Sequence, residues 1–430
     1  MMFSPSPLRW LYLDFNSYFA SVEQQLNPAL RGRPVAVVPV ESDSSCAIAA
    51  SYEAKAYGIK TGTAIWEARQ LCPDLICVLA RHDAYVDYHH RAVAEINRHI
   101  PVSAVCSIDE VAAQLMRNEA QPEAARRIAL SIKAGLADNL GPWVRCSIGI
   151  AANRFLAKVG ADLQKPDGLT ILMPDEVEAR LTAALKPTDL PGIGRNMERR
   201  LRRQGIYTMA DIFALDRKQM RRVWGSIWGE RIYYYLRGFD LPEPVTQRRT
   251  IGHSHVLAPS LRPPWQAIYV VRRLTLKAAS RLRRMDYYAQ RYAISIRLED
   301  GRRLFEEMRF RPAQDSMTFL EMLQEFWERH MLRDRGMLVK KASVVLYGLI
   351  HASACQNDLF DPPLYDAPDR AVPASEDRRK MLRLSLALDK INSRFGRDSV
   401  LIGMLPSAGR GFSGTKIAFT RIPELAEFNE

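Results

Sequence analysis

Three carboxylates lie in or at the end of apolar segments of the sequence. Asp14 closes the run Leu11–Asp14, and Asp109 and Glu110 are adjacent within the apolar segment Val105–Val111. A buried carboxylate is costly unless a positive group neutralises it. Carboxylate oxygens suit Mg²⁺, and two such ions can assist an in-line phosphoryl transfer. Neighbouring side chains on a strand point to opposite faces, so Asp109 and Glu110 can share a site only where a strand ends or bulges.

Surface or ion-paired acids at strand ends are the alternative interpretation. A motif as short as an Asp-Glu pair recurs by chance, so this alternative is the default for the pair alone. The chemical interpretation of the carboxylates therefore depends on what surrounds them in the sequence.

A glycine-containing turn precedes a run of arginines. The turn is Pro191-Gly192-Ile193-Gly194. Glycine lets the backbone approach a phosphate closely, and the helix that follows presents free N–H groups at the same place. The arginines that follow are Arg195, Arg199, Arg200, Arg202 and Arg203. A routine helix-connecting turn is the alternative, but the arginines favour a turn that binds a phosphate.

The excess positive charge is confined to one part of the chain. Lys and Arg total 61 against 48 Asp and Glu, a net charge of +13. Residues 191–310 contain 25 basic and 11 acidic residues, whereas the other 310 residues contain 36 and 37. Such confinement is typical of a surface that binds nucleic acid. A basic surface kept for solubility, the alternative, usually spreads its charge.

Composition argues against several other classes of protein. The 430 residues are 47% hydrophobic and 25% charged, as in ordinary globular chains. No run approaches the ~18 apolar residues of a membrane span, and the first residues do not resemble a secretory signal. Six Cys lack CxxC spacing and eight His add no zinc signature. We expect a cytoplasmic protein with reduced thiols and no membrane contact.

Apolar periodicity predicts the elements that must position these groups. Residues 1–173 alternate between strands and helices, which is typical of an α/β or α+β layer domain. The predicted strands are 11–14, 35–40, 105–111, 145–150 and 169–173, and the longer helices are 83–100, 120–140 and 153–163. An all-helical stretch over 175–240 and a small α+β domain with helices at 264–285 and 317–332 follow, and then a helix at 377–394.

Five segments, in order, resemble motifs of the Y-family, or translesion, DNA polymerases, in particular bacterial DinB/UmuC-like members. The segments are LYLDFNSYFASVEQ (11–24), SYEAKAYGIKTG (51–62), CSIDE (106–110), SIGIAANRFLAKVGADLQKPDG (147–168) and LPGIGRNMERRLRRQGI (190–206). The resemblance covers residues 11–240 with specific motifs and continues more loosely to about residue 350.

The resemblance implies a multidomain α+β fold of the right-hand polymerase type. Its parts would be a ferredoxin-like palm, small fingers, a helical thumb with a helix-hairpin-helix, and an α+β little-finger domain. The implied bounds are palm 11–17 and 80–172, fingers 18–79, thumb 173–240, linker 241–250, little finger 251–350 and C-terminal tail 351–430.

The resemblance also implies roles for the carboxylates. Asp14, Asp109 and Glu110 match the family's metal-binding residues, with Asp109 and Glu110 as the catalytic pair. Phe15 matches the residue whose backbone carbonyl completes one metal site. The implied cofactor is a pair of Mg²⁺ ions, for which Mn²⁺ could substitute.

Four residues match the family's nucleotide-binding positions. Phe19 matches the steric gate, the ring that rejects a 2′-hydroxyl, although by itself it would be assigned to the core. Tyr52, Lys55 and Lys165 match residues that bind the incoming triphosphate. Lys55 stands where the family usually has Arg, and Ala49 where it often has Thr. Lys cannot make the bidentate phosphate contact of Arg, which bears on the strength of nucleotide binding and not on the reaction.

The resemblance implies partners as well. The implied DNA-binding residues are Gly192, Gly194, Arg195, Arg199, Arg248 and Arg249. Gln356, Leu359 and Phe360 lie beyond the last predicted domain and resemble the short motif by which bacterial polymerases bind the sliding clamp. The expected partners are primer-template DNA, deoxynucleoside triphosphates and a sliding clamp, and the chain is expected to be a monomer.

The implied function is error-prone translesion DNA synthesis in DNA damage tolerance and repair. A DNA-directed DNA polymerase of this kind adds deoxynucleotides to a primer 3′-OH by two-metal-ion phosphoryl transfer. A non-catalytic DNA-binding polymerase adaptor of the same superfamily is the alternative. Retention of all three carboxylates counts against the adaptor. No exonuclease-like acidic constellation is evident, so proofreading is not expected.

Overall fold

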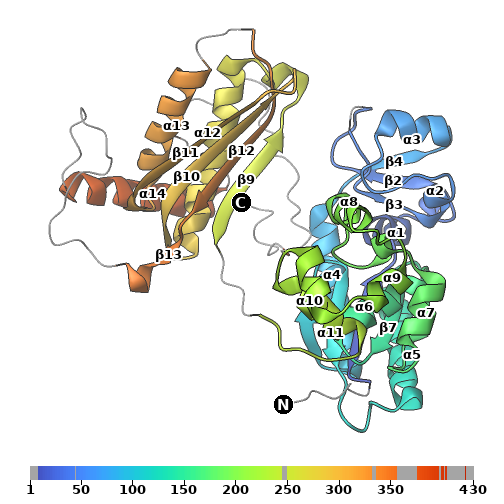
Figure 1. Ribbon diagram of the computed structural model, residues 1–430. Coiled ribbons are helices and arrows are strands. Elements are labelled where there is room, and N and C mark those ends of the chain that lie inside the picture. Colours follow the sequence, from blue (N-terminus) through green and yellow to red (C-terminus); the bar gives the residue numbers. More distant parts are fainter. Residues whose placement is uncertain are drawn as a thin grey trace. The chain divides into compact units, whose positions relative to one another are not determined.

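The chain forms two compact units, Met1–Pro244 with Thr415–Phe428 and Val245–Gly414 with Asn429–Glu430. The computed structural model describes residues 8–43, 45–244, 249–331, 336–355, 375–396, 399–400, 402–403 and 422 (Figure 1). Each unit contains a β-sheet and helices, which confirms the predicted multidomain α+β class. Over these described ranges, no helix is both long and apolar enough to cross a membrane.

The first unit is built on a five-stranded sheet with the strand order β5-β6-β1-β7-β8. β1 (Trp10–Phe15) lies in the middle and is antiparallel to both β6 (Glu110–Gln114) and β7 (Cys146–Ala151). β5 (Val102–Val105) pairs with β6, and β8 (Leu169–Ile171) runs parallel to β7. Because β1 is the central strand, side chains on both of its faces are buried, which accounts for its apolar sequence.

Different helices cover the two faces of this sheet. One face of β1 packs against α1 (Tyr18–Leu26), α4 (His82–His99) and α5 (Pro122–Asn139) in a single apolar core. The opposite face, which carries Tyr12, packs against α6 (Arg154–Leu163) and helices that follow it. Alternation along β1 therefore places Asp14 on the face that carries Tyr12, the face that α6 covers.

The close approach of α6 to the sheet depends on Gly149 of β7. A Cβ at this position would lie 2.0 Å from the carbonyl oxygen of Ala157 and 2.3 Å from the backbone nitrogen of Ala161, so a larger residue would displace the helix. Asn153 begins the helix, because its side chain accepts a hydrogen bond from the Leu156 N–H at 2.8 Å. These contacts fix the position of α6 over the strands.

Two smaller assemblies complete the first unit. One is a three-stranded sheet with the order β3-β2-β4, whose strands are β2 (Val35–Val38), β3 (Ala49–Ala50) and β4 (Ile76–Leu79). The helices η1 (Pro28–Leu30), α2 (Tyr52–Ala56) and α3 (Ile65–Leu71) lie before and between these strands in the sequence. The helical cluster after β8 contains α7 (Val177–Ala184), η2 (Pro187–Asp189), α8 (Arg195–Arg203), α9 (Met209–Ala214), α10 (Arg217–Trp224) and α11 (Ile227–Leu236). Apolar residues of this cluster share a core with α6.

The second unit is an antiparallel sheet with the strand order β11-β10-β12-β9. Short β13 (Ile350–His351) pairs with β10, and α12 and α13 pack their apolar faces into the core of the sheet. The elements are β9 (Thr250–Val256), η3 (Pro259–Leu261), α12 (Pro264–Arg284), β10 (Tyr287–Leu298), β11 (Arg303–Ala313), α13 (Ser316–His330), β12 (Val339–Tyr347) and η4 (Ala352–Ala354).

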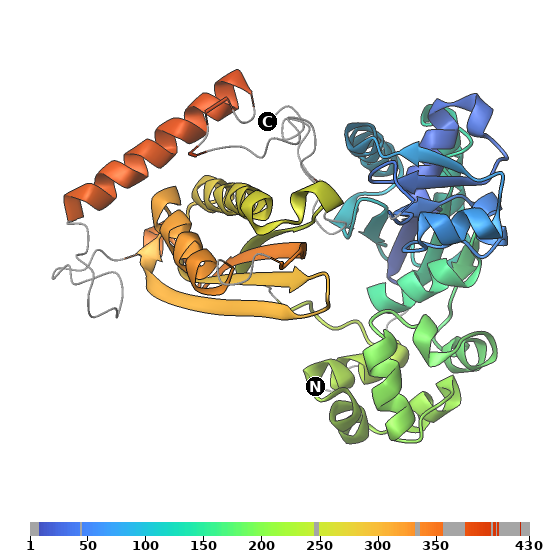
Figure 2. The same ribbon diagram turned by 90° about the horizontal axis from the view of Figure 1, so that it is seen from above.

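A further helix, α14 (Ser375–Phe395), docks on the helical side of the second unit (Figure 2). The guanidinium of Arg283 on α12 donates to both carboxylate oxygens of Asp389, at 2.7 and 3.0 Å. The Ser385 hydroxyl oxygen accepts a hydrogen bond from the backbone N–H of Ser316 at 3.0 Å, where α13 begins. The helix predicted at 377–394 is thus confirmed and belongs to the second unit.

The strand predicted over 105–111 is wrong. β5 ends at Val105 and β6 begins at Glu110, so residues 106–109 form the turn of a hairpin. Ile108 is buried in spite of lying in the turn, which explains why the apolar pattern looked continuous. Adjacent residues of one strand point to opposite faces, but Asp109 lies in the turn and Glu110 begins β6. This restriction therefore does not keep the two acids apart.

Candidate active site

Strand pairing brings Asp14 and Glu110 side by side. The register of β1 and β6 places Asp14 directly opposite Glu110, and residues directly opposite in an antiparallel pair share one face of the sheet. On its other side Asp14 pairs with Ser147 of β7. The two carboxylates therefore stand together on the face that α6 covers, at the end of the central strand.

The hairpin turn places Asp109 beside this pair. The Ser107 hydroxyl donates to Oδ1 of Asp109 at 2.6 Å and lies 3.1 Å from Oε2 of Glu110, so one hydroxyl links the two acids. The backbone N–H of Phe15 donates to the carbonyl oxygen of Asp109 at 2.8 Å, which ties the turn to the end of β1. The three carboxylates are thus held by neighbouring backbone segments.

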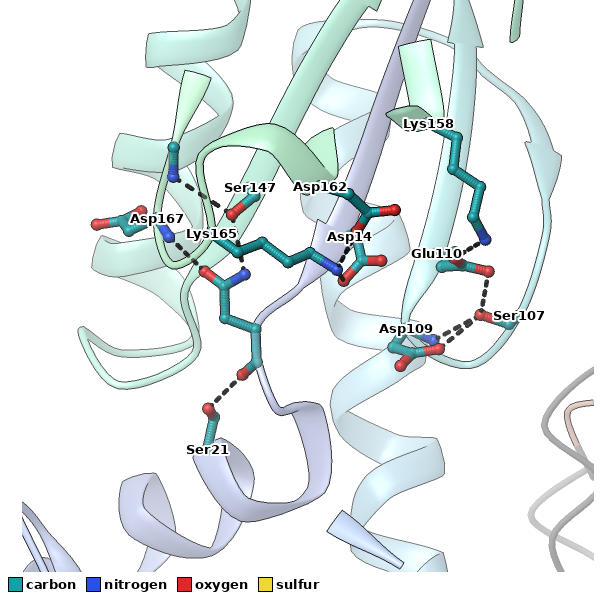
Figure 3. Close-up of polar contacts among 12 residues, drawn as sticks. Asp14, Ser21, Ser107, Asp109, Glu110, Ser147, Lys158, Asp162, Lys165 and Asp167 are labelled. Atoms are coloured by element: carbon teal, nitrogen blue, oxygen red, sulfur yellow. Dashed lines mark hydrogen bonds and ion pairs between the residues drawn. The ribbon is translucent and has the colours of Figure 1, made fainter. Parts of the chain in front are cut away.

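Two lysines from α6 and the turn after it face the carboxylates (Figure 3). Lys165 Nζ lies 2.8 Å from Oδ1 of Asp14 and 2.7 Å from Oδ1 of Asp162. Lys158 forms an ion pair with Glu110. Asp14 and Glu110 therefore have separate ammonium partners, whereas Asp109 is bonded to a hydroxyl.

Burial dominates the ionisation of these acids. It raises the pKa of Asp14 to about 7, because Lys165 offsets only part of the cost of burying the charge. Burial also raises the pKa of Asp109. Burial acts in the same direction on Glu110, but Lys158 and Ser107 outweigh it, so the pKa of Glu110 is lowered. Asp14 and Asp109 would gain stabilisation from any further positive charge placed beside them.

The donor set fits divalent magnesium. It consists of hard carboxylate oxygens, and burial raises the pKa of Asp14 and Asp109, so a bound cation would stabilise their ionised forms. Within the described ranges, no three Asp, Glu, His or Cys side chains gather tightly enough to share one ion. Lys165 pairs with Asp14 and Lys158 pairs with Glu110, so each of these two carboxylates is engaged with its own ammonium group. The metal-binding roles of these carboxylates, and of the Phe15 carbonyl, stay predictions.

Tyr52 and Lys55, on α2, lie close to Lys165 and Asp14. The Lys55 ammonium lies 4.3 Å from the centre of the Tyr52 ring. Burial lowers the pKa of Lys55, and the nearby Lys165 lowers it further. Burial raises the pKa of Tyr52, with Lys165 and Asp14 among the charges that act on it. The structure therefore gathers three of the four nucleotide-binding candidates at one place.

The fourth candidate, Phe19, is buried on α1. Its ring stacks on Tyr85 of α4 with 4.4 Å between ring centres and 17° between planes. Only 3% of Phe19 is exposed, as expected for the core residue that it would be on composition alone. Ala49, the other departure from the family pattern, is buried in β3.

Sequence reasoning missed Lys158 and Asp162 as members of this site. Lys158 and Asp162 are four residues apart in the helix predicted at 153–163, which places them on one face, and Lys165 follows in the turn after the helix. That spacing was a usable signal. Ser107 could not be found in this way, because its role depends on the hairpin turn.

The candidate DNA-binding residues are partly in place. Gly192 has a φ of +89°, a left-handed conformation that favours glycine, and Gly194 is the capping residue just before α8. Arg195 and Arg199 are exposed on the first two turns of α8, and Arg249 is exposed before β9. Arg248 lies outside the described residues. The clamp-binding candidates Gln356, Leu359 and Phe360 also lie outside them.

Comparison with known protein families covers most of the chain. Residues 13–162 match the impB/mucB/samB family, and residues 248–359 match the C-terminal domain of that family. Residues 188–240 match the thumb domain of DNA polymerase iota. The three matches follow one another in the order of the chain.

Curated relatives decide the family. DNA polymerase IV of Alkalilimnicola ehrlichii is 31% identical over 343 residues, which cover 79% of this chain and 95% of the relative. DNA polymerase IV of Moorella thermoacetica is 30% identical over 393 residues, covering 90% and 93%. The chain belongs to the Y-family of DNA polymerases. It is a translesion DNA-directed DNA polymerase, and the comparisons give no support to the adaptor alternative.

Solved structures agree with this Y-family assignment. A Y-family DNA polymerase chimera built on Dbh has a TM-score of 0.66 at 24% identity, covering 80% of this chain and 99% of that one. The insertion ternary complex of Dbh DNA polymerase has a TM-score of 0.53 at 25% identity over the same shares. The predicted right-hand polymerase fold is confirmed. As a member of this family, the polymerase depends on divalent metal ions.

Proposed function

We propose that Asp14, Asp109 and Glu110, with the backbone carbonyl of Phe15, hold two Mg²⁺ ions in this Y-family polymerase. The observation that carries the proposal is the register that sets Asp14 opposite Glu110, with Asp109 tied to the end of β1. Asp109 and Glu110 are the proposed catalytic residues. When bound, such ions favour ionisation of the primer 3′-OH and neutralise the triphosphate, and Mn²⁺ can take their place.

The lysines and Tyr52 form the proposed triphosphate site. Lys165 offers a point charge next to Asp14, at the position where a phosphate and the carboxylates would meet. Lys55 and Tyr52 lie near Lys165 and Asp14, and burial already disfavours the charge on Lys55. An anionic triphosphate would restore that charge. Because Lys55 is not Arg, it binds one phosphate oxygen at a time, without a bidentate contact.

Phe19 is the proposed steric gate. It lies on the first turn of α1, which follows β1 and Asp14 with only Asn16 and Ser17 between the strand and the helix. A ring fixed this close to the metal-binding carboxylates could exclude a 2′-hydroxyl from the sugar of the incoming nucleotide.

Primer-template DNA and deoxynucleoside triphosphates are the proposed partners. Relatives of known structure include an insertion ternary complex and a post-insertion binary complex of Dbh DNA polymerase. In this chain the exposed hairpin at Gly192 and Gly194, with Arg195 and Arg199, presents backbone N–H groups and positive charge to a DNA phosphate. Arg248 and Arg249 would add contacts before β9.

We assign the parts of the hand as the sequence predicted them. The palm would contain the five-stranded sheet with α4, α5 and α6, and the fingers would contain the β3-β2-β4 sheet. The thumb would contain the helices from α7 to α11, and the little finger the sheet of the second unit. The assignment is supported by the separate sheets and by the thumb-domain match at residues 188–240.

Primer extension tests this proposal directly. The purified polymerase should add the templated deoxynucleotide to a primer in Mg²⁺, stop when EDTA removes the ion, and resume when Mg²⁺ or Mn²⁺ is restored. DNA affinity, followed by fluorescence anisotropy of a labelled primer-template, should persist in EDTA and fall as salt rises, because bound phosphates release counterions. Failure to extend a primer with any divalent ion would instead identify a non-catalytic adaptor.

We also propose a sliding clamp as partner, with the polymerase as a monomer. Replacing Leu359 and Phe360 together by Ala should leave extension of a short primer unchanged and remove stimulation by a loaded clamp. Two buried apolar anchors contribute about 1.5–3 kcal/mol each, so their loss should weaken clamp binding by roughly 100- to 10,000-fold. Titration of the clamp against both proteins measures this change. Equal affinities would leave residues 356–360 as a linker with a chance match.

A further inference from the structure

Four residues, among them the proposed gate Phe19, connect α1 with α4 through side-chain contacts. Phe19 and Glu23 are one helical turn apart on α1, and Tyr85 lies four residues after Arg81, the residue that caps the N-terminal end of α4. Residues four apart on a helix share a face, so each helix turns two of these residues toward the other. We call Phe19, Glu23, Arg81 and Tyr85 the α1–α4 ladder.

The ladder is continuous from the gate ring to an ion pair. Phe19 stacks on Tyr85, and the Tyr85 hydroxyl donates a hydrogen bond to Oε1 of Glu23 at 2.8 Å. Arg81 Nε donates to the same oxygen at 3.1 Å, and Arg81 Nη2 donates to Oε2. The Glu23 side chain is 1% exposed, whereas Arg81 is 48% exposed. Both oxygens of a buried carboxylate are thus occupied.

The ladder leaves the Tyr85 ring little freedom. Its hydroxyl end is bonded to Glu23, and its backbone carbonyl oxygen accepts a hydrogen bond from the Tyr18 hydroxyl at 2.8 Å. Hydrogen bonds to a charged partner are shorter and stronger than those between neutral groups. Removing Arg81 would leave the Glu23 carboxylate buried without its cation, and the carboxylate would have to move or take up a proton. Either change would disturb the surface on which Phe19 stacks.

We propose that Glu23 and Arg81, acting through Tyr85, are positioning residues that hold the Phe19 ring and so set the discrimination between deoxy- and ribonucleotides. The inference rests on the proposed role of Phe19 as steric gate. Steric rejection of one hydroxyl requires a ring that cannot shift by the width of that hydroxyl. The stack on Tyr85, whose hydroxyl is bonded to Glu23, supplies that restraint.

The test uses the full-length polymerase and single-nucleotide insertion. Arg81→Met keeps the apolar stem of the side chain and removes its charge, and Tyr85→Phe keeps the stacked ring and removes its hydroxyl. The ratio of kcat/KM for a deoxynucleotide to that for the matching ribonucleotide should fall about tenfold in each variant, as expected for loss of a charge-assisted hydrogen bond. The fall should come from faster ribonucleotide insertion, with deoxynucleotide kcat/KM within about threefold of wild type.

Two controls separate positioning from general damage. Arg91→Met removes another arginine of α4, which pairs with exposed Asp87 and not with α1, and should leave the ratio unchanged. In a Phe19→Ala background, Arg81→Met should add nothing to the loss of discrimination. A normal ratio in folded Tyr85→Phe, or an additive effect without the Phe19 ring, would overturn the inference. An unchanged ratio in Phe19→Ala alone would instead overturn the proposed gate. If Arg81→Met does not fold, the conservative Tyr85→Phe decides.

Discussion

Replacement of Asp109 by Ala is expected to abolish nucleotide addition while leaving DNA binding nearly intact. The carboxylate would hold metal ions whose charge stabilisation is worth several kcal/mol, and each 1.4 kcal/mol is tenfold in rate. We therefore expect nucleotide addition to slow by about 1,000-fold or more. DNA affinity should persist because the excess of basic residues lies at 191–310, away from Asp109 in the sequence. Glu110→Ala should behave in the same way.

Single-turnover primer extension measures this loss, and anisotropy of a labelled primer-template measures DNA binding. Asp87→Ala is the matched control, since Asp87 is an exposed acid of the same unit that pairs with Arg91. Burial raises the pKa of Asp109, so its ionised form is disfavoured in the folded protein and its removal should not lower the melting temperature. Extension within tenfold of wild type, or a collapse of DNA affinity, would show that the catalytic assignment is wrong.

Replacement of Phe19 by Ala should allow the polymerase to insert ribonucleotides. The ring fills the space that we propose a 2′-hydroxyl would need, and steric exclusion of this kind can give large ratios between substrates. The ratio of deoxy- to ribonucleotide kcat/KM should fall by about 100-fold or more, well beyond the tenfold expected for a change in the residues that support the ring. Single-nucleotide kinetics with both substrates on one template measure the ratio.

The same substitution should destabilise the fold, and this effect needs its own control. Loss of a buried Phe ring typically costs about 3–5 kcal/mol. Phe310→Ala removes a comparably buried ring that contacts Phe319 in the second unit, and it should lower stability without changing sugar discrimination. Phe19→Leu keeps most of the packing volume and should show intermediate discrimination. A deoxy-to-ribo ratio that stays at the wild-type value in Phe19→Ala would mean that another residue is the gate.

Local sequence predicted the elements of this fold better than their pairing. β1 and α6 follow from apolar periodicity, and α6 is further marked by the capping residue Asn153. The register that sets Asp14 opposite Glu110 could not be derived, because it is decided by contacts between segments almost one hundred residues apart. The resemblance to the family predicted that these acids form one metal-binding site, whereas reasoning from the residues alone did not bring them together.

The hairpin turn before Glu110 shows where local reasoning fails. The apolar residues Val105, Ile108 and Val111 span the segment, and this apolar character predicted a single strand over 105–111. The turn buries Ile108 in the core while Ser107 bonds the two acids, so tertiary contacts override the apparent strand. Lys158 escaped notice for a different reason, since its ion pair with Glu110 requires the strand and the helix to be brought together first.

The helix α14 is held on the second unit by side-chain contacts of its own. Cys355 and α14 both belong to the second unit, and α14 is anchored there through Asp389 and Ser385. The attachment of α14 to this unit therefore does not depend on the backbone between Cys355 and Ser375 alone. A single break in the backbone between these two residues should leave α14 bound to the second unit through these contacts.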